Sequence, residues 1–160
     1  MKNIIWGLII GLLAGSIGTA LIFWDKMPEL MLNVNESRYS FDQTYTNLED
    51  AILEQDWDIQ HVYNISECME NYGYESLNQI SIFSICNAGN VNNILQDDED
   101  RKVTAIMPCR IAVYEKTDGS VWVASLNIGL MSKMFGGNIE SVMSSVAEDE
   151  AKMLESVLAD

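Results

Sequence analysis

An uncharged run from Ile4 to Trp24 constrains the folding of this chain more than any other feature of its sequence. The run is about as long as a helix must be to cross the hydrocarbon core of a bilayer, so we expect a transmembrane anchor over residues 1–26. Lys2 and the amino terminus precede the run, and Lys26 follows it. The flank with more positive charge favours the cytoplasmic side, and the N-terminal flank carries both Lys2 and the amino terminus. We therefore expect a cytoplasmic N-terminus and an extracytoplasmic domain.

The same run leaves two alternatives open. Small residues at Ala14-Gly15-Ser16 and Gly18-Thr19-Ala20 could be cleaved by a signal peptidase, which would release a secreted domain, although the apolar run continues beyond them. Gly7, Gly11 and Gly15 recur at every fourth position and share one helical face, where a second helix could approach closely. Glycine is frequent in membrane helices, so the spacing is equally compatible with no dimer seam.

Beyond the run, the composition becomes that of a globular domain. Met27-Pro28-Glu29 interrupts the apolar pattern and polar residues follow, so residues 27–37 are expected to form a tether. Residues 38–160 suffice for one domain with a single core. The formal net charge of −15 would repel phosphate backbones, which argues against nucleic acid as a partner. The acidic clusters at 97–100 and 148–150 are expected to be solvated faces rather than calcium ligands.

The first half of the domain shows helical and strand periodicity in turn. Residues 41–55 carry apolar side chains at helical spacing behind a capping box at Ser40, which predicts a helix. Residues 57–65 alternate apolar and polar side chains, which predicts a strand and places His61 on its apolar face. A short helix or loop ended by Gly73 follows.

The second half contains the clearest element, a predicted hairpin. Residues 79–86 form an isoleucine-rich strand, and Asn87 can cap the helix after it. Two β-rich runs, 109–116 and 120–127, then flank Thr117-Asp118-Gly119, which is typical of a hairpin turn.

Two helices are predicted after the hairpin. A short one covers residues 128–135, and Asn138 caps a last helix with an apolar stripe from Ile139 to Val157. Methionines recur at helical spacing here, and we interpret them as core filler rather than as a cofactor or metal site.

Two cysteines are the best candidates for chemistry. Cys86 lies directly before the Asn87 cap, where backbone amides and the helix dipole could stabilise a thiolate. Cys109 begins the hairpin strand behind Pro108, and Arg110 beside it could lower the thiol pKa or bind an anion. Simple burial is the alternative for both thiols, and an ion pair with an acid is the alternative for Arg110.

Metal and enzyme sites find less support. Neighbouring strand ends would allow a disulfide between the two cysteines, or a two-thiolate metal site with His61 as a third ligand. The chain has no CxxC pair and no second histidine, so we expect no metal site, and we interpret His61 as a hydrogen-bonded core side chain. It also lacks a Gly-x-Ser-x-Gly elbow, a phosphate loop and a dinucleotide fingerprint, so nucleotide-dependent chemistry has no visible site and the cofactor stays unknown.

A family resemblance rests on two strings, Ile82-Phe83-Ser84-Ile85-Cys86-Asn87 and Met107-Pro108-Cys109-Arg110-Ile111-Ala112-Val113-Tyr114-Glu115, followed by Asp118-Gly119 and Ser125-Leu126-Asn127. On these motifs the chain resembles the DUF302 family of bacterial and archaeal proteins. The resemblance implies a compact α+β fold with a mostly antiparallel sheet covered by helices, and self-association as a homodimer. It also matches Cys86 and Cys109 to cysteine positions of the family, but implies no reaction.

These features together favour a membrane-tethered, extracytoplasmic domain without enzymatic activity. Its expected role is ligand binding or thiol-redox sensing through Cys86 and Cys109. A structural module that dimerises or meets a protein partner is the first alternative, and a small thiol enzyme is the second.

Overall fold

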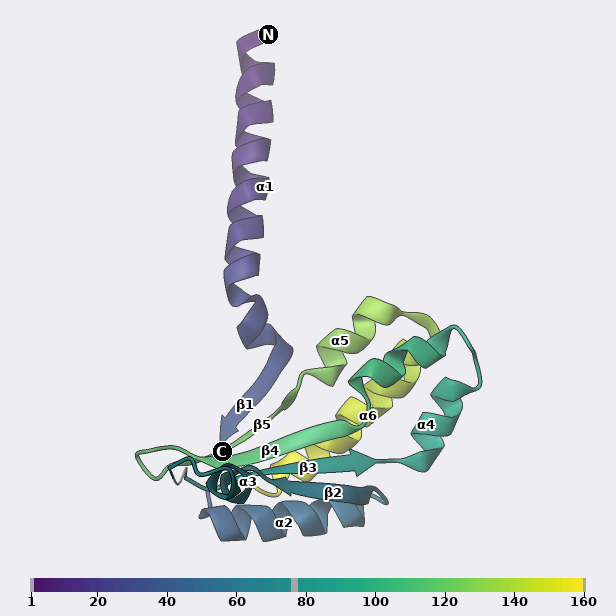
Figure 1. Cartoon of the computed structure of the whole chain (residues 1–160). Coiled ribbons are helices and arrows are strands. Elements are labelled where there is room, and N and C mark those ends of the chain that lie inside the picture. The colour runs from purple at the N-terminus through teal and green to yellow at the C-terminus, as the bar shows by residue number, and fades with distance from the viewer. Residues whose placement is uncertain (1, 76–77, 160) are drawn as a thin grey trace. The chain divides into compact units, whose positions relative to one another are not determined.

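The computed structural model describes residues 2–75 and 78–159, and the chain divides into two compact units at Leu32. The first unit is one helix, α1 (Lys2–Met31) (Figure 1). In the part of the chain that the structure describes, no helix is both long enough and apolar enough to cross a membrane. The transmembrane anchor expected over residues 1–26 is therefore not supported.

α1 also differs from the prediction at its end. Pro28 was expected to interrupt the helix, but it lies inside α1, which continues to Met31. A Cβ atom added at Gly7, Gly11 or Gly15 would meet no other atom within 4 Å. The helix seam predicted on that face therefore stays a prediction.

The second unit is built on a five-stranded antiparallel sheet in the order β1-β5-β4-β3-β2 (Figure 1). Its strands are β1 (Leu32–Glu36), β2 (Asp58–Asn64), β3 (Ile80–Cys86), β4 (Cys109–Glu115) and β5 (Val121–Leu126). β4 and β5 pair directly across the turn at residues 117–119, where Gly119 has a φ of +84° that favours glycine. The predicted hairpin is confirmed.

β1 occupies residues that were expected to belong to the tether. Its sequence, Leu32-Asn33-Val34-Asn35-Glu36, is mostly polar, and the strand lies at the sheet edge, where it pairs with β5. An edge strand that buries little surface needs no apolar run, so its sequence resembles a linker. The Ser37 hydroxyl then donates to the Val157 carbonyl at 3.0 Å, which ties this edge to the C-terminal end of the unit.

The described part of this unit has six helical segments. They are α2 (Phe41–Glu54), α3 (Ile65–Asn71), α4 (Ala88–Leu95), the 3-10 helix η1 (Asp100–Ile106), α5 (Ile128–Phe135) and α6 (Gly137–Glu155). α2 and α6 pack against each other as well as over the sheet, and α5 and α4 flank α6 (Figure 1). The α+β fold with helices covering an antiparallel sheet is confirmed.

The hydrophobic core lies between the sheet and these helices. Phe83 of β3 and Ile111 and Val113 of β4 are fully buried, and the Tyr45 ring of α2 lies 4.8 Å from the Phe83 ring. Because side chains alternate along a strand, Ile82, which directly precedes Phe83, points to the opposite face of the sheet and stays partly exposed.

The predicted helix starts were partly correct. The Asn87 side chain caps α4 by accepting a hydrogen bond from the Asn90 backbone N–H at 3.0 Å. Ser40, however, makes no side-chain cap bond to α2. Asn138 caps nothing, because α6 already begins at Gly137, and its side chain donates instead to a carbonyl of α4 at 3.1 Å.

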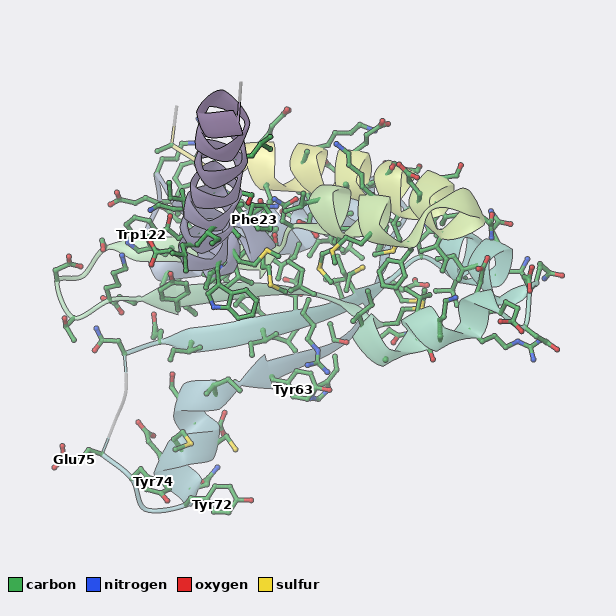
Figure 2. The ribbon with its side chains drawn as sticks, turned by 90° about the horizontal axis from the view of Figure 1, so that it is seen from above. Phe23, Tyr63, Tyr72, Tyr74, Glu75 and Trp122 are labelled. Atoms are coloured by element: carbon green, nitrogen blue, oxygen red, sulfur yellow. The ribbon has the colours of Figure 1, made fainter. Side chains whose placement is uncertain are left out.

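The prediction that His61 faces the core was wrong. The pairing of β2 with β3 shifts register between Ile59 and His61, which is the signature of a β-bulge. Beyond the bulge, Val62 is the half-buried residue packed against the core, whereas His61 and Tyr63 (Figure 2) are exposed and their ring centroids lie 4.4 Å apart. One inserted residue has moved His61 to the other face of the sheet.

Candidate functional site

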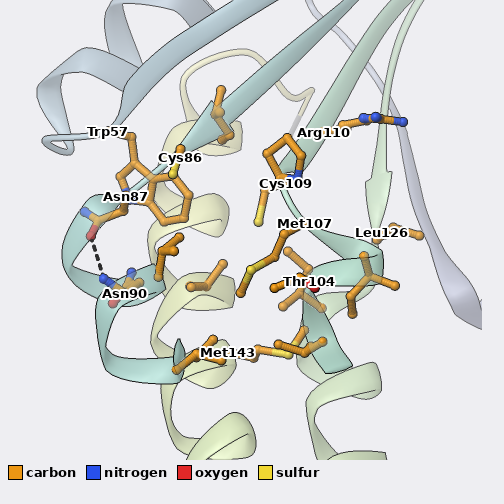
Figure 3. Close-up of a pocket in the computed structure, with 18 of the residues that line it drawn as sticks. Trp57, Cys86, Asn87, Asn90, Thr104, Met107, Cys109, Arg110, Leu126 and Met143 are labelled. Carbon is orange, nitrogen blue, oxygen red and sulfur yellow. Dashed lines mark hydrogen bonds between the residues drawn. The ribbon is translucent and has the colours of Figure 1, made fainter. Parts of the chain in front are cut away.

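A cavity of about 280 Å³ lies at the end of the sheet where β3 ends and β4 begins. Segments of α4, η1, α5 and α6 enclose it together with the strand ends (Figure 3). Most of its wall is apolar, including Ile85, Ile94, Val103, Ile128 and Val146. We call this cavity the sheet-end pocket.

The antiparallel register of β3 and β4 brings the two cysteines to this pocket. Ile85 pairs with Cys109, so Cys86 lies one residue beyond that pair. Cys86, Asn87, Cys109 and Arg110 all line the pocket. Four of the five predicted site residues in the domain are thus together, and the fifth, His61, lies on the exposed face of β2.

Trp57 forms part of the wall and was not singled out by the sequence. It is 4 % exposed, and its indole Nε1 donates to the Asp149 carboxylate of α6 at 3.3 Å. The hydrogen bond fixes the ring at the edge of the pocket, where Figure 3 shows it near Asn87. Its position directly before a strand was the only sequence signal, and it resembled an ordinary core position.

Both the oxygen and the nitrogen of the Asn87 side-chain amide make hydrogen bonds within the protein. Besides capping α4, the side chain donates to the Asp56 carbonyl at 3.3 Å, in the turn between α2 and β2. This pair of bonds links the start of α4 to the turn that carries Trp57. Asn87 therefore holds the rim of the pocket in place.

The environment of both thiols disfavours the thiolate. Burial, followed by the Asp58 carboxylate, raises the pKa of the Cys86 thiol. Burial, followed by Glu150 and then Cys86, raises the pKa of Cys109 to about 12. Burial is the largest cause for both thiols, so the direction of these pKa values is opposite to the lowering that a helix N-terminus or Arg110 could produce. Arg110 itself is exposed, and Figure 3 shows its side chain extending away from the cavity.

Glu150 is the most unexpected residue near this site. It belongs to the cluster at 148–150 that was predicted to be solvated, yet it is only 5 % exposed and accepts a hydrogen bond from the Ser125 hydroxyl of β5 at 2.7 Å. Burial raises its pKa from 4.5 to about 7, although the bond from Ser125 lowers it. Helical spacing held the signal, because Glu150 lies one turn after Val146 on the buried stripe of α6.

The cysteines form no disulfide, and they differ in exposure. Cys86 and Cys109 are half-buried free thiols, whereas Cys68 on α3 is a free, exposed thiol outside the pocket. Within the described residues, no group of three or more His, Cys, Asp or Glu side chains is placed to hold a metal ion. The disulfide considered from the sequence is therefore not formed.

Comparison with known proteins agrees with this architecture. A family model described as "Domain of unknown function DUF302" matches residues 33–160. A solved structure, the crystal structure of an uncharacterized conserved DUF302 protein from Bacillus stearothermophilus, is similar with a TM-score of 0.69 at 15 % sequence identity. The match covers 79 % of this chain and 97 % of that one. No curated protein matches the chain.

Proposed function

Because this chain belongs to the DUF302 family, whose description names no activity, we propose its function from its own geometry: it is a binding module that holds a small ligand in the sheet-end pocket. The observation that carries the proposal is the mostly apolar cavity of about 280 Å³, whose wall includes residues of the buried core. Ligand sites are concave and largely apolar, and this volume is close to the lower end of their range.

The state of the thiols favours binding over catalysis or redox sensing. A thiolate is the reactive form of cysteine, and sensor cysteines have low pKa values. Here the pKa of both pocket thiols is raised. Protonated thiols in an apolar wall contact a ligand rather than attack it, which supports a non-enzymatic role.

The proposal can be tested with N-phenyl-1-naphthylamine, an apolar probe that fluoresces when it leaves water. We expect the full chain to bind it, and a Leu95→Phe variant to bind at least about tenfold more weakly because the added ring fills the pocket that Leu95 lines. The matched control is Leu53→Phe, since Leu53 is 55 % exposed on α2 outside the pocket. Equal affinity of all three proteins, with both variants folded, would contradict the proposal.

A second candidate function is homodimerisation through the open face of the sheet. One row of that face crosses all five strands, because the register pairs Val34 with Ala124, Ala124 with Ala112, Ala112 with Ile82, and Ile82 with Tyr63. All five residues are partly or largely exposed. A row of small and apolar side chains suits a flat, self-complementary contact.

Sedimentation of the full chain tests this second candidate. We expect a dimer that Ala124→Lys dissociates, because the lysine would place a charge at the centre of the row. Ala88→Lys, at an exposed position of α4, is the matched control and should leave the dimer intact. A monomeric wild type, or equal association of both variants, would contradict the candidate.

A further inference from the structure

Five sulfur-containing side chains line the sheet-end pocket. They are Cys86 at the end of β3, Met107 and Cys109 at the start of β4, Met131 on α5 and Met143 on α6. Figure 3 shows the side chains of Cys109 and Met107 extending into the cavity. Sulfur atoms from four parts of the fold thus border one space.

Apart from Asn90, which is half-buried near the start of α4, the other polar side chains in the lining either make hydrogen bonds within the protein or are exposed. Asn87 uses its amide to cap α4 and to bond Asp56, and the Thr104 hydroxyl donates to a carbonyl of its own 3-10 helix at 2.8 Å. Gln60 and Arg110 are exposed. The described residues supply no hydrogen-bond partner for the thiols of Cys86 and Cys109. The heteroatoms that the wall itself offers to a ligand are therefore chiefly sulfur.

We propose that the sheet-end pocket binds a soft monovalent metal ion, Cu(I), through Cys86, Cys109 and Met107. The inference rests on the proposed binding function and names the ligand class of that same pocket. Thiolate and thioether ligands select Cu(I), whereas zinc is held by four ligands from cysteine, histidine or carboxylates, a set that the described residues do not assemble. The residue types in the wall therefore distinguish between the two metals.

Cysteine binds metal ions as thiolate, so Cu(I) must displace the proton of both Cys86 and Cys109, and these protons pass to solvent. The bound ion cancels one of the two negative charges so formed, and the thioether of Met107 adds none. Because the pKa of both thiols is raised, this proton release makes binding weaken as the pH falls. Methionine has three rotatable bonds, so the empty volume leaves room for the thioethers of Met107, Met131 and Met143 to close on the ion.

The experiment is an anaerobic titration of the reduced full chain with Cu(I) in competition with bicinchoninate. We expect one ion per chain in the pocket. Cys109→Ser should weaken binding by roughly 100-fold and Met107→Leu by about tenfold, the range over which even supporting residues affect metal sites. Two matched controls should bind as the wild type does: Cys68→Ser, on α3, and Met134→Leu, which is 76 % exposed on α5.

Two further measurements make every outcome decisive. Thermal unfolding of each apo variant separates loss of the site from loss of the fold, and X-ray absorption of the wild type with Ag(I) should show sulfur neighbours whatever the variants do. Loss of binding in Cys68→Ser instead of Cys109→Ser, or oxygen and nitrogen neighbours around the metal, would overturn the inference. If the wild type binds the naphthylamine probe but no Cu(I), the inference fails and the binding function stands; if it binds neither, both fail.

Discussion

The two faces of the sheet are built from the same strands but pack very differently. On the covered face, Phe83, Ile111 and Val113 are fully buried, yet the same face ends in an unfilled pocket and encloses the carboxyl group of Glu150. On the open face, Ala112 of β4 pairs with Ala124 of β5, and neither residue lines the sheet-end pocket. A cavity and a buried acid both reduce stability, so the covered face gives up stability at the end of the sheet where we propose that a ligand binds.

The largest expected change in the free energy of unfolding distinguishes the covered face of the sheet from the open face. Phe83→Ala should reduce the free energy of unfolding by about 3–5 kcal/mol, because it empties the centre of the core. Ile82→Ala, the adjacent residue on the open face, should cost roughly 1 kcal/mol because its side chain is already partly solvated. Urea denaturation of both variants measures the difference, and similar losses would mean that both faces are buried in the working protein.

Glu150 allows a sharper test of the covered face. Its pKa is about 7 in the folded chain against 4.5 as the ordinary value, so the folded state holds more protons between these pH values and stability falls as pH rises through that window. The full cost, about 3 kcal/mol, applies above pH 7. Glu150→Gln keeps an acceptor for Ser125 and should therefore recover most of this at pH 8, but almost nothing below pH 4.5.

Glu148→Gln is the control for this prediction, since Glu148 is exposed on the same helix. It should leave the pH profile of the unfolding free energy unchanged. An unaltered profile for Glu150→Gln as well would show that the carboxyl group is solvated in the native protein.

Much of the fold could be predicted from local patterns. The turn Thr117-Asp118-Gly119 between two β-rich runs determined the hairpin, and Asn87 indicated the start of α4 because a short polar side chain can cap a helix. The two cysteines, as residues at strand ends, pointed to the end of the sheet where the pocket lies. In each case the residues that determine the local structure lie within a few positions of it in the sequence.

The predictions failed where a residue's position depends on distant parts of the chain, or where an inserted residue interrupts the alternation of a strand. A bulge after Ile59 turned His61 outwards, and alternation alone cannot show an inserted residue. Glu150 looked like a solvated acid because its neighbours are acidic, whereas its burial is set by β5 across the core. The wall of the pocket comes from segments between Trp57 and Val146, so only the tertiary fold assembles it.

The smallest expected effect concerns the open face. The Lys116 ammonium lies 3.3 Å from the centroid of the Trp122 ring, a cation–π contact worth about 0.5–1 kcal/mol at an exposed position. Lys116→Met should lose this amount in urea denaturation, whereas Lys133→Met, at an exposed position of α5, should lose less. Equal losses would indicate that the contact does not stabilise the turn.

The most direct test of the pocket as a binding site uses the three cysteines as internal reporters. Alkylation by N-ethylmaleimide, followed residue by residue with peptide mass spectrometry, should be fast at Cys68 and slow at Cys86 and Cys109, which are half-buried and have raised pKa values. Saturating N-phenyl-1-naphthylamine should slow alkylation further at Cys86 and Cys109 and leave Cys68 unchanged. Unchanged rates at all three cysteines while the probe is bound would contradict the account, because the probe would then occupy another place on the protein.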